Sequence, residues 1–157
     1  MVETMTAGSA GDGLSEAAQL LHDFNLEYDE PTPPTEELAV RLGALVADDH
    51  VIVLLARDQD TDAAVGVAVM RVHPSLWSPA QEAYLAELYV VPGRRGQGYG
   101  RQLITEAMRV AREQGADYAY VITSEDDRLA QRLYEAAGFR RTEGAGGPLM
   151  LAYERDL

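Results

Sequence analysis

Apolar residues recur along the chain with two different periods, and this predicts a mixture of helices and strands. A first segment from Ser15 and a second at residues 38–46 have apolar positions at helical spacing. Between them, the prolines of residues 30–34 exclude a helix, because each removes an amide donor and restricts the residue before it. Thr35 is expected to cap the second helix.

Strand signals follow and lead into a turn that is rich in glycine. Residues 51–57 and 63–72 are apolar runs, and the polar connection between them is typical of a hairpin. Residues 82–91 form a third run, and an amphipathic helix at about 103–111 follows the turn and ends at Gly115. The remaining expected elements are a strand at 118–123, a helix at 127–137 and a terminal strand near 149–154.

Adjacent hairpins combined with strand-helix-strand units predict an α/β protein of the mixed α+β type. We expect a mixed sheet with helices on both faces. The length of 157 residues fits a single domain over 1–157. The first dozen residues fit either a frayed tail or a short first strand, and we favour a strand over residues 2–7.

Charge and composition exclude several classes of function. The net charge of -13 gives a surface that repels phosphate backbones, so we expect no nucleic acid partner. The chain has no cysteine, which excludes disulfides and cysteine nucleophiles, and its three histidines are scattered, so no metal is implied. No apolar run is long enough to span a bilayer and no signal peptide is evident, so we expect a cytoplasmic protein that does not bind membranes.

The most informative stretch joins the third strand to the amphipathic helix through Gly96, Gly98 and Gly100. Glycines let the backbone approach a ligand closely, and the free amides at a helix start bind anions. Arg94 and Arg95 add positive charge to an acidic chain, which favours a pyrophosphate-bearing ligand. The spacing matches neither a P-loop nor a dinucleotide fingerprint. The structural alternative is a tight turn with its arginines in solvent.

This stretch also resembles the Arg/Gln-x-x-Gly-x-Gly/Ala signature of the GNAT acetyltransferases, which Arg95, Gly98 and Gly100 match. Residues 130–139 resemble the late helix of the same family, with its Leu-Tyr and Gly-Phe pairs. The resemblance covers most of the chain. It implies the GNAT fold, with a mostly antiparallel mixed sheet splayed between its fourth and fifth strands. It also implies acetyl-CoA as cosubstrate and coenzyme A as product, with the pantetheine arm in the gap.

Carried over position by position, the resemblance assigns residues to the cofactor. Amides of the glycine turn are expected to hold the pyrophosphate, and the Val90 backbone to pair with pantetheine. The Leu88 amide is expected to polarise the thioester carbonyl. Asp127 stands where many relatives have asparagine, which keeps a helix cap but adds a negative charge near CoA. The expected cofactor residues are Leu88, Tyr89, Val90, Arg95, Gly96, Gln97, Gly98, Tyr99, Gly100, Arg101 and Asp127.

Two residues are candidates for proton transfer. Tyr134 matches the tyrosine near the departing sulfur, which is the general acid in many relatives. Its alternative role is that of a packed tyrosine on the helix. Glu87 lies on the strand beside the expected thioester and is the best remaining carboxylate to accept the proton of an amine. A water chain is the alternative base, and a solvated strand residue is the alternative role of Glu87.

The loop after the first helix, which closes over the substrate side of this fold, supplies Asn25, Glu27, Tyr28 and Asp29. Carboxylates and an aromatic ring suit a cation, although an ordinary acidic surface is the alternative. The sequence thus predicts an N-acetyltransferase that acts directly on a small cationic primary amine, similar to a polyamine or an aminoglycoside. A protein lysine or N-terminal acetyltransferase and a non-catalytic acetyl-CoA sensor stay open. A homodimer is compatible with the sequence.

Overall fold

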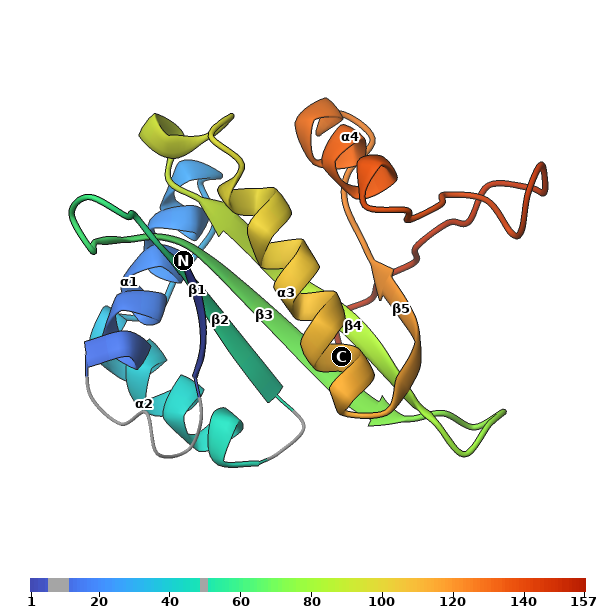
Figure 1. Ribbon diagram of the computed structural model, residues 1–157, viewed down its shortest axis with the longest axis horizontal. Coiled ribbons are helices and arrows are strands. Elements are labelled where there is room, and N and C mark those ends of the chain that lie inside the picture. The colour runs from blue at the N-terminus through green and yellow to red at the C-terminus, as the bar shows by residue number, and fades with distance from the viewer. Residues whose placement is uncertain (6–11, 49–50) are drawn as a thin grey trace.

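The computed structural model describes residues 1–5, 12–48 and 51–157, and its strands form one five-stranded sheet (Figure 1). The strands are β1 (Val2–Met5), β2 (Val51–Arg57), β3 (Ala64–Pro74), β4 (Gln81–Val90) and β5 (Ala116–Val121). They follow chain order across the sheet; the first four are antiparallel, and β5 is parallel to β4. The mixed, mostly antiparallel sheet predicted from the sequence is confirmed.

Helices cover both faces of this sheet (Figure 1). The helices are α1 (Asp12–Glu27), α2 (Thr35–Ala47), α3 (Tyr99–Glu113) and α4 (Arg128–Ala136), with a short 3-10 helix, η1 (Pro92–Arg94). α1 and α2 bury apolar side chains against one face, and α3 packs on the other, where Tyr134 of α4 joins the same core. Within the described ranges, no helix combines the length and apolar character needed to cross a membrane.

β4 and β5 separate part way along their length, and this opens the sheet. Their parallel pairing ends at Leu85 and Val121, although β4 stays paired with β3 as far as Val90. At the same level the register between β3 and β4 skips Ala86, so β4 carries a bulge there. A bulge bends the strand that contains it and so directs the second half of β4 away from β5. The predicted splay between the fourth and fifth strands is confirmed.

Residues 149–154 form no strand, contrary to the sequence prediction. Leu149 makes one isolated bridge with Thr142, and the side chains of Leu151 and Tyr153 are exposed. Figure 1 shows the chain after α4 running out from the body of the molecule before it turns back. Alternating apolar residues become a strand only where a neighbour completes the backbone hydrogen bonds, and in the described structure no strand flanks this segment.

Several expected boundaries also differ from the structure, including those of β5, which begins at Ala116 and ends at Val121, not at 118 and 123. Thr35 is the first residue of α2 and not its cap, because Pro34 occupies the capping position and makes no side-chain bond to the helix. The proline ring holds φ at -54°, which suits a residue that leads the chain into a helix. The first strand is present, but residues 6 and 7 of the expected range lie outside the described residues.

Candidate active site

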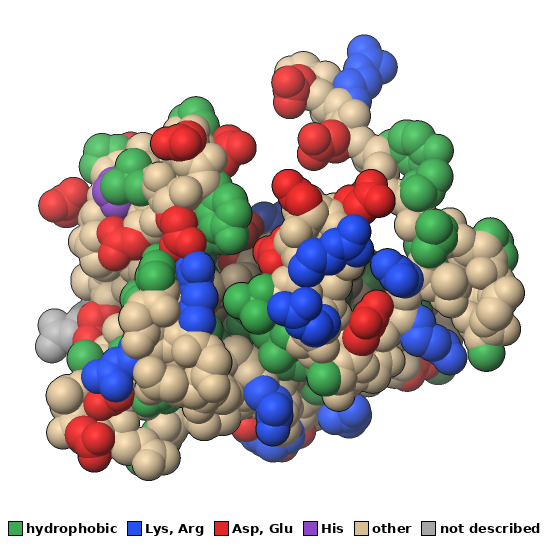
Figure 2. Space-filling model, turned by 90° about the horizontal axis from the view of Figure 1, so that it is seen from above, with side chains coloured by type: hydrophobic (Ala, Val, Ile, Leu, Met, Phe, Trp, Pro, Cys, Tyr) green, Lys and Arg blue, Asp and Glu red, His purple; other side chains and the backbone are tan. Residues whose placement is uncertain are grey.

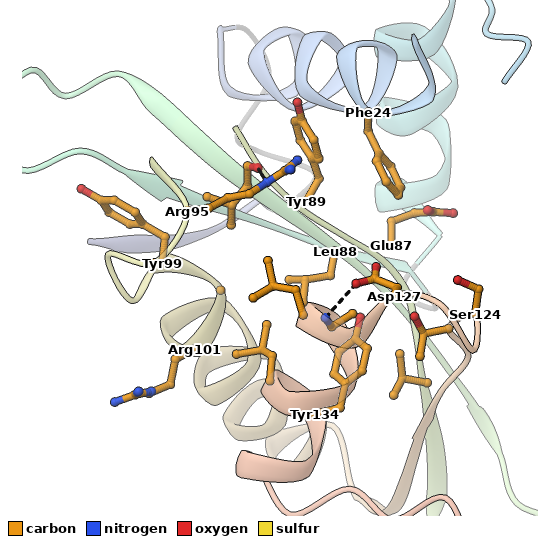
Figure 3. Close-up of a pocket in the computed structure, with 18 of the residues that line it drawn as sticks. Phe24, Glu87, Leu88, Tyr89, Arg95, Tyr99, Arg101, Ser124, Asp127 and Tyr134 are labelled. Carbon is orange, nitrogen blue, oxygen red and sulfur yellow. Dashed lines mark hydrogen bonds between the residues drawn. The ribbon is translucent and has the colours of Figure 1, made fainter. Parts of the chain in front are cut away.

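A cavity of about 490 Å³ opens where β4 and β5 separate. Its walls come from the end of α1, the second half of β4, the glycine turn, the end of β5 with its following loop, and α4 (Figure 3). Seen from above, the molecule is hollowed between the part that contains α1 and the part that contains α4 (Figure 2). The splay of the sheet therefore creates a site that is open to ligands.

The glycine turn forms one end of the cavity, and its backbone explains two of the glycines. Gly96 and Gly98 have φ values of 76° and 92°, in the left-handed region that other residues rarely adopt. No atom beyond the adjoining residues lies within 4 Å of where a Cβ on either glycine would stand. Gly98 caps α3 without a side chain, so the first helical amides depend on another partner. This is a backbone suited to an anion.

Gly100 serves a different purpose at the same turn. A Cβ at this position would lie 3.0 Å from a methyl group of Leu133, which is tighter than side chains normally pack. Glycine therefore lets the start of α3 approach α4 across the cavity. Tyr99, between the glycines, is buried and turns its phenol out of the cavity, away from Leu88 and Tyr134 (Figure 3). The turn thus offers ligands its main chain at Tyr99 and not the hydroxyl.

Both arginines of the turn are paired with carboxylates, so the alternative of solvated arginines is wrong. Arg94 lies 3.0 Å from Asp58, and Arg95 lies 2.8 Å from Glu27, the last residue of α1. Arg95 also donates its Nε–H to the carbonyl oxygen of Val90 at 2.9 Å. The hydrogen bond from Arg95 lowers the pKa of Glu27. Glu27, expected to meet the acceptor, therefore connects α1 to the glycine turn.

Glu87 lines the cavity in the second half of β4, as the sequence analysis required of a base. Its side chain lies between Phe24 of α1 and Asp127 before α4 (Figure 3). Burial raises the pKa of Glu87, and the positive charge of Arg71 on β3 partly opposes this rise. A half-desolvated carboxylate with a raised pKa holds a proton more readily than an exposed one.

Tyr134 lies across the cavity from Glu87 and is 9% exposed. Its ring packs edge-on against Phe139, with 6.0 Å between the centroids. Burial, and after it the charges of Asp127 and Glu87, raise the pKa of Tyr134 to about 12. The phenol therefore remains protonated at neutral pH and can donate a hydrogen bond into the cavity, while its ring also contributes to the core.

Asp127 lies at the cavity as expected, whereas most of the expected acceptor residues do not. Asp127 caps α4, as expected, by accepting the amide of Ala130 at 2.9 Å, and it lines the cavity. Of the expected acceptor residues, Tyr28 reaches the cavity, whereas Asn25, Glu27 and Asp29 lie outside its lining. The Asn25 amide donates to the carbonyl of Pro31 and so shapes the loop.

The expected cofactor residues are mostly brought together by the structure. Leu88, Tyr89, Val90 and the turn residues all line the cavity, with the exception of Gln97, whose amide donates to the carbonyl of Gly93. Phe24, one of the apolar residues of the first helix, also lines the cavity, although the sequence analysis assigned it no role in the site. It precedes Tyr28 by one helical turn, and this spacing could have placed the two rings on one face.

Comparison with known proteins decides the family. The model of the Acetyltransferase (GNAT) family matches residues 17–139, a range that contains every residue lining the cavity. The chain belongs to the GNAT acetyltransferase family. Members of this family generally use acetyl-CoA as cosubstrate, which agrees with a glycine turn suited to an anion beside a splayed sheet.

The curated GNAT relatives match this chain over part of their length. Mycothiol acetyltransferase of Beutenbergia cavernae is 32% identical over 107 residues, which cover 66% of this chain and 33% of that protein. The D-amino-acid N-acetyltransferase HPA3 of Saccharomyces cerevisiae is 33% identical over 86 residues, or 55% of this chain and 53% of that protein. The matched region thus spans about a third to a half of each relative.

Solved structures extend the similarity to the whole chain. A candidate acetyltransferase from Arthrobacter sp. FB24 is 39% identical, with a TM-score of 0.86 over 100% of this chain and 96% of the other. An aminoglycoside acetyltransferase from a soil metagenome, solved with sisomicin, has a TM-score of 0.77 at 19% identity and covers 100% and 95% of the two chains. The latter similarity concerns the GNAT fold alone.

Proposed function

We propose that this protein transfers the acetyl group of acetyl-CoA directly to the primary amine of a small acceptor. One observation carries the proposal: a single cavity joins an anion-binding turn at one end to Glu87 and Tyr134 at the other. The turn suits the pyrophosphate of CoA, and the two side chains suit proton transfer at a thioester. Open space around Gly96 and Gly98 and the unpaired side of β4 fit the phosphates and the pantetheine arm.

The main chain would hold and polarise the thioester. Amides from Gly96 to Arg101 would bind the pyrophosphate, and the Leu88 amide would donate to the carbonyl oxygen as negative charge develops there. The carbonyl of Val90 already accepts a bond from Arg95. If pantetheine pairs with the Val90 carbonyl, it will share an acceptor that also holds Arg95 in place.

Glu87 would accept the proton that the amine must lose. A primary ammonium has a reference pKa of about 10.4, so freeing its lone pair at pH 7 costs roughly 4 to 5 kcal/mol. A carboxylate in the cavity whose pKa is raised by burial meets this need better than an exposed one. Tyr134 would then donate a hydrogen bond to the departing sulfur. Acetyl-CoA and acceptor meet in one site, and no acyl-enzyme is required.

The proposed role of Glu87 predicts an acid limb in the pH profile of kcat/KM. The rate should fall as pH drops through the raised pKa of Glu87, because the protonated acid accepts no proton. Arg71→Gln removes the charge that opposes the rise, so the limb should move to higher pH. Glu87→Gln should abolish the limb and lower the rate by about 100-fold or more.

The control for this experiment is His73→Gln, which replaces a histidine of β3 that pairs with Glu82 and not with Glu87. His73 lies 6.5 Å from the Tyr120 ring, on the sheet face that also carries Tyr84. Its replacement should leave the acid limb in place. If the acid limb of kcat/KM shifts in His73→Gln and stays at the same pH in Arg71→Gln, Glu87 is not the base.

We infer that the acceptor is a small cationic amine. Glu87 and Asp127 place two carboxylates on the cavity wall, Phe24 and Tyr28 add aromatic rings, and the chain carries a net charge of -13. Carboxylates at the cavity wall help an ammonium to bind, although they also oppose its deprotonation. An aminoglycoside acetyltransferase shares the fold, and the curated relatives include a D-amino-acid N-acetyltransferase, so both classes are relevant acceptors for comparison.

An amine panel that follows release of the CoA thiol tests this inference. Polyamines and aminoglycosides should give a lower KM than neutral amines or amino acids, and the advantage should shrink as salt screens the charges. Equal activity on anionic acceptors at all salt concentrations would contradict the cationic class. Activity confined to peptides would favour a protein acetyltransferase. Binding of acetyl-CoA without thiol release on any amine would favour a sensor.

A further inference from the structure

Asp58 is a buried acidic residue outside the cavity. Its side chain is 4% exposed, and within the described residues it is the only buried side chain of a charged residue type. It directly follows β2, in the hairpin that leads to β3. A buried carboxylate is costly unless it is paired, so its partners indicate why it is there.

The two oxygens of Asp58 have different partners. Oδ1 accepts bonds from its own hairpin: the amide of Asp60 at 3.1 Å, and the amide and hydroxyl of Thr61 at 3.0 and 2.9 Å. Oδ2 instead reaches the glycine turn, 36 to 41 residues later in the chain. It accepts the hydroxyl of Tyr99 at 3.0 Å and lies 3.0 Å from a guanidinium nitrogen of Arg94.

Arg94 and Tyr99 stand at the two ends of the segment that contains Gly96 and Gly98. This segment has no local support from side-chain caps, because neither η1 nor α3 has a capping side chain. Its glycines also give the unliganded backbone more freedom than other residues would. One carboxylate oxygen thus holds both ends of this segment, while Arg95 and Gln97 make separate contacts within it.

The geometry points to Asp58 as the positioning residue of the cofactor turn: it holds Arg94 and Tyr99 together so that the amides between them face a diphosphate. This inference rests on the proposed binding of acetyl-CoA. Asp58 itself would not contact the ligand. The anchor is formed during folding, so the turn does not have to be ordered again when the ligand binds.

Asp58 is negatively charged near neutral pH. The hydrogen bond from the Thr61 hydroxyl, supported by Tyr99 and by two backbone amides, lowers the pKa of Asp58 to about 2. Burial and the bond to Asp58 raise the pKa of Tyr99. Near neutral pH the acceptor is therefore ionised and the donor is protonated.

The test compares Asp58→Asn with the matched variant Thr61→Val. Asp58→Asn removes the charge facing Arg94 and should raise the Kd of acetyl-CoA by at least about tenfold in calorimetry. Hydrogen exchange at the amides of residues 96–98 should become faster. Thr61→Val removes one donor to Oδ1 but keeps both backbone amides on that oxygen and the contacts of Oδ2 with Arg94 and Tyr99, so it should lower Tm and leave the Kd unchanged. Tyr99→Phe keeps the backbone of the turn and should raise the Kd several-fold.

The outcomes separate this inference from the proposed function. A wild-type protein that does not bind acetyl-CoA would overturn both. If the wild type binds, an unchanged Kd in folded Asp58→Asn, or an equal rise in Thr61→Val, overturns the positioning role alone. Should Asp58→Asn fail to fold, Tyr99→Phe decides, and wild-type affinity in that variant overturns the inference. A further measure is the KM of the acceptor amine, which should stay constant while that of acetyl-CoA rises.

Discussion

Tyr134→Phe is expected to lower kcat by at least about tenfold while the affinity for acetyl-CoA stays nearly unchanged. The substitution removes only the hydroxyl oxygen. Without a donor, the sulfur of CoA leaves as an unassisted thiolate. Because the pKa of Tyr134 is about 12, the phenol stays protonated and contributes mainly through a hydrogen bond to the sulfur. Its loss should appear in kcat and not in the KM of acetyl-CoA.

Kinetics and melting must be measured on the same preparation, because Tyr134 also packs against Phe139. The raised pKa has a further consequence for the pH profile: wild-type activity should show no loss from ionised Tyr134 between about pH 8 and pH 10. A purely structural role would give a lower Tm with kcat per folded molecule intact. That result would remove Tyr134 from the catalytic residues.

Gly98→Val is expected to abolish the thermal stabilisation that acetyl-CoA confers on the wild type. At a hundredfold excess over its Kd, the ligand should stabilise the wild type by about 2.7 kcal/mol, whereas NAD and ATP should not. Gly98 has a φ of 92°, which strains a β-branched residue, and the added side chain would enter the open space beside the amides. The variant therefore loses both the shape of the turn and access to it.

Gly93→Ala is the matched control, since Gly93 lies near the turn and a Cβ there would also meet no atom within 4 Å. It lacks the positive φ of Gly98. Its melting shift with acetyl-CoA should equal that of the wild type, and circular dichroism should show that both variants are folded. An unmoved melting curve for the wild type itself would refute the proposed cosubstrate.

The sequence was most informative where local chemistry determines structure. The glycine turn could be located because Gly96 and Gly98 adopt a positive φ, which residues other than glycine rarely do. Strands buried on both faces could be recognised as continuous apolar runs, and β2 has the predicted bounds. The prediction of a terminal strand was wrong because a strand also needs a distant neighbour. The alternating apolar residues at 149–154 make pairing possible, but the sequence does not show whether another strand lies beside them.

Long-range contacts explain what could not be predicted at the site. Glu27 appeared as one of several acidic residues on a loop, and only the fold shows that Arg95, 68 positions later, takes its carboxylate. Asp58 gave no signal at all, because its role depends on a hairpin meeting a turn from another part of the chain. The splay followed from the family resemblance, whereas its physical cause, the bulge at Ala86, is visible only in the register.

The contacts of Arg95 also couple two distant parts of the molecule. Its guanidinium reaches Glu27 and Val90 at once, and lies 5.6 Å from the centre of the Tyr89 ring, which the point charge of a lysine could not reproduce. Loss of Glu27 would leave a positive charge unpaired in a partly desolvated position. A substitution at Glu27, at the end of α1, should therefore disturb Arg95, the first residue of the family signature. Through this one guanidinium, the first helix and the glycine turn form a single mechanical unit, although 68 residues separate the two side chains.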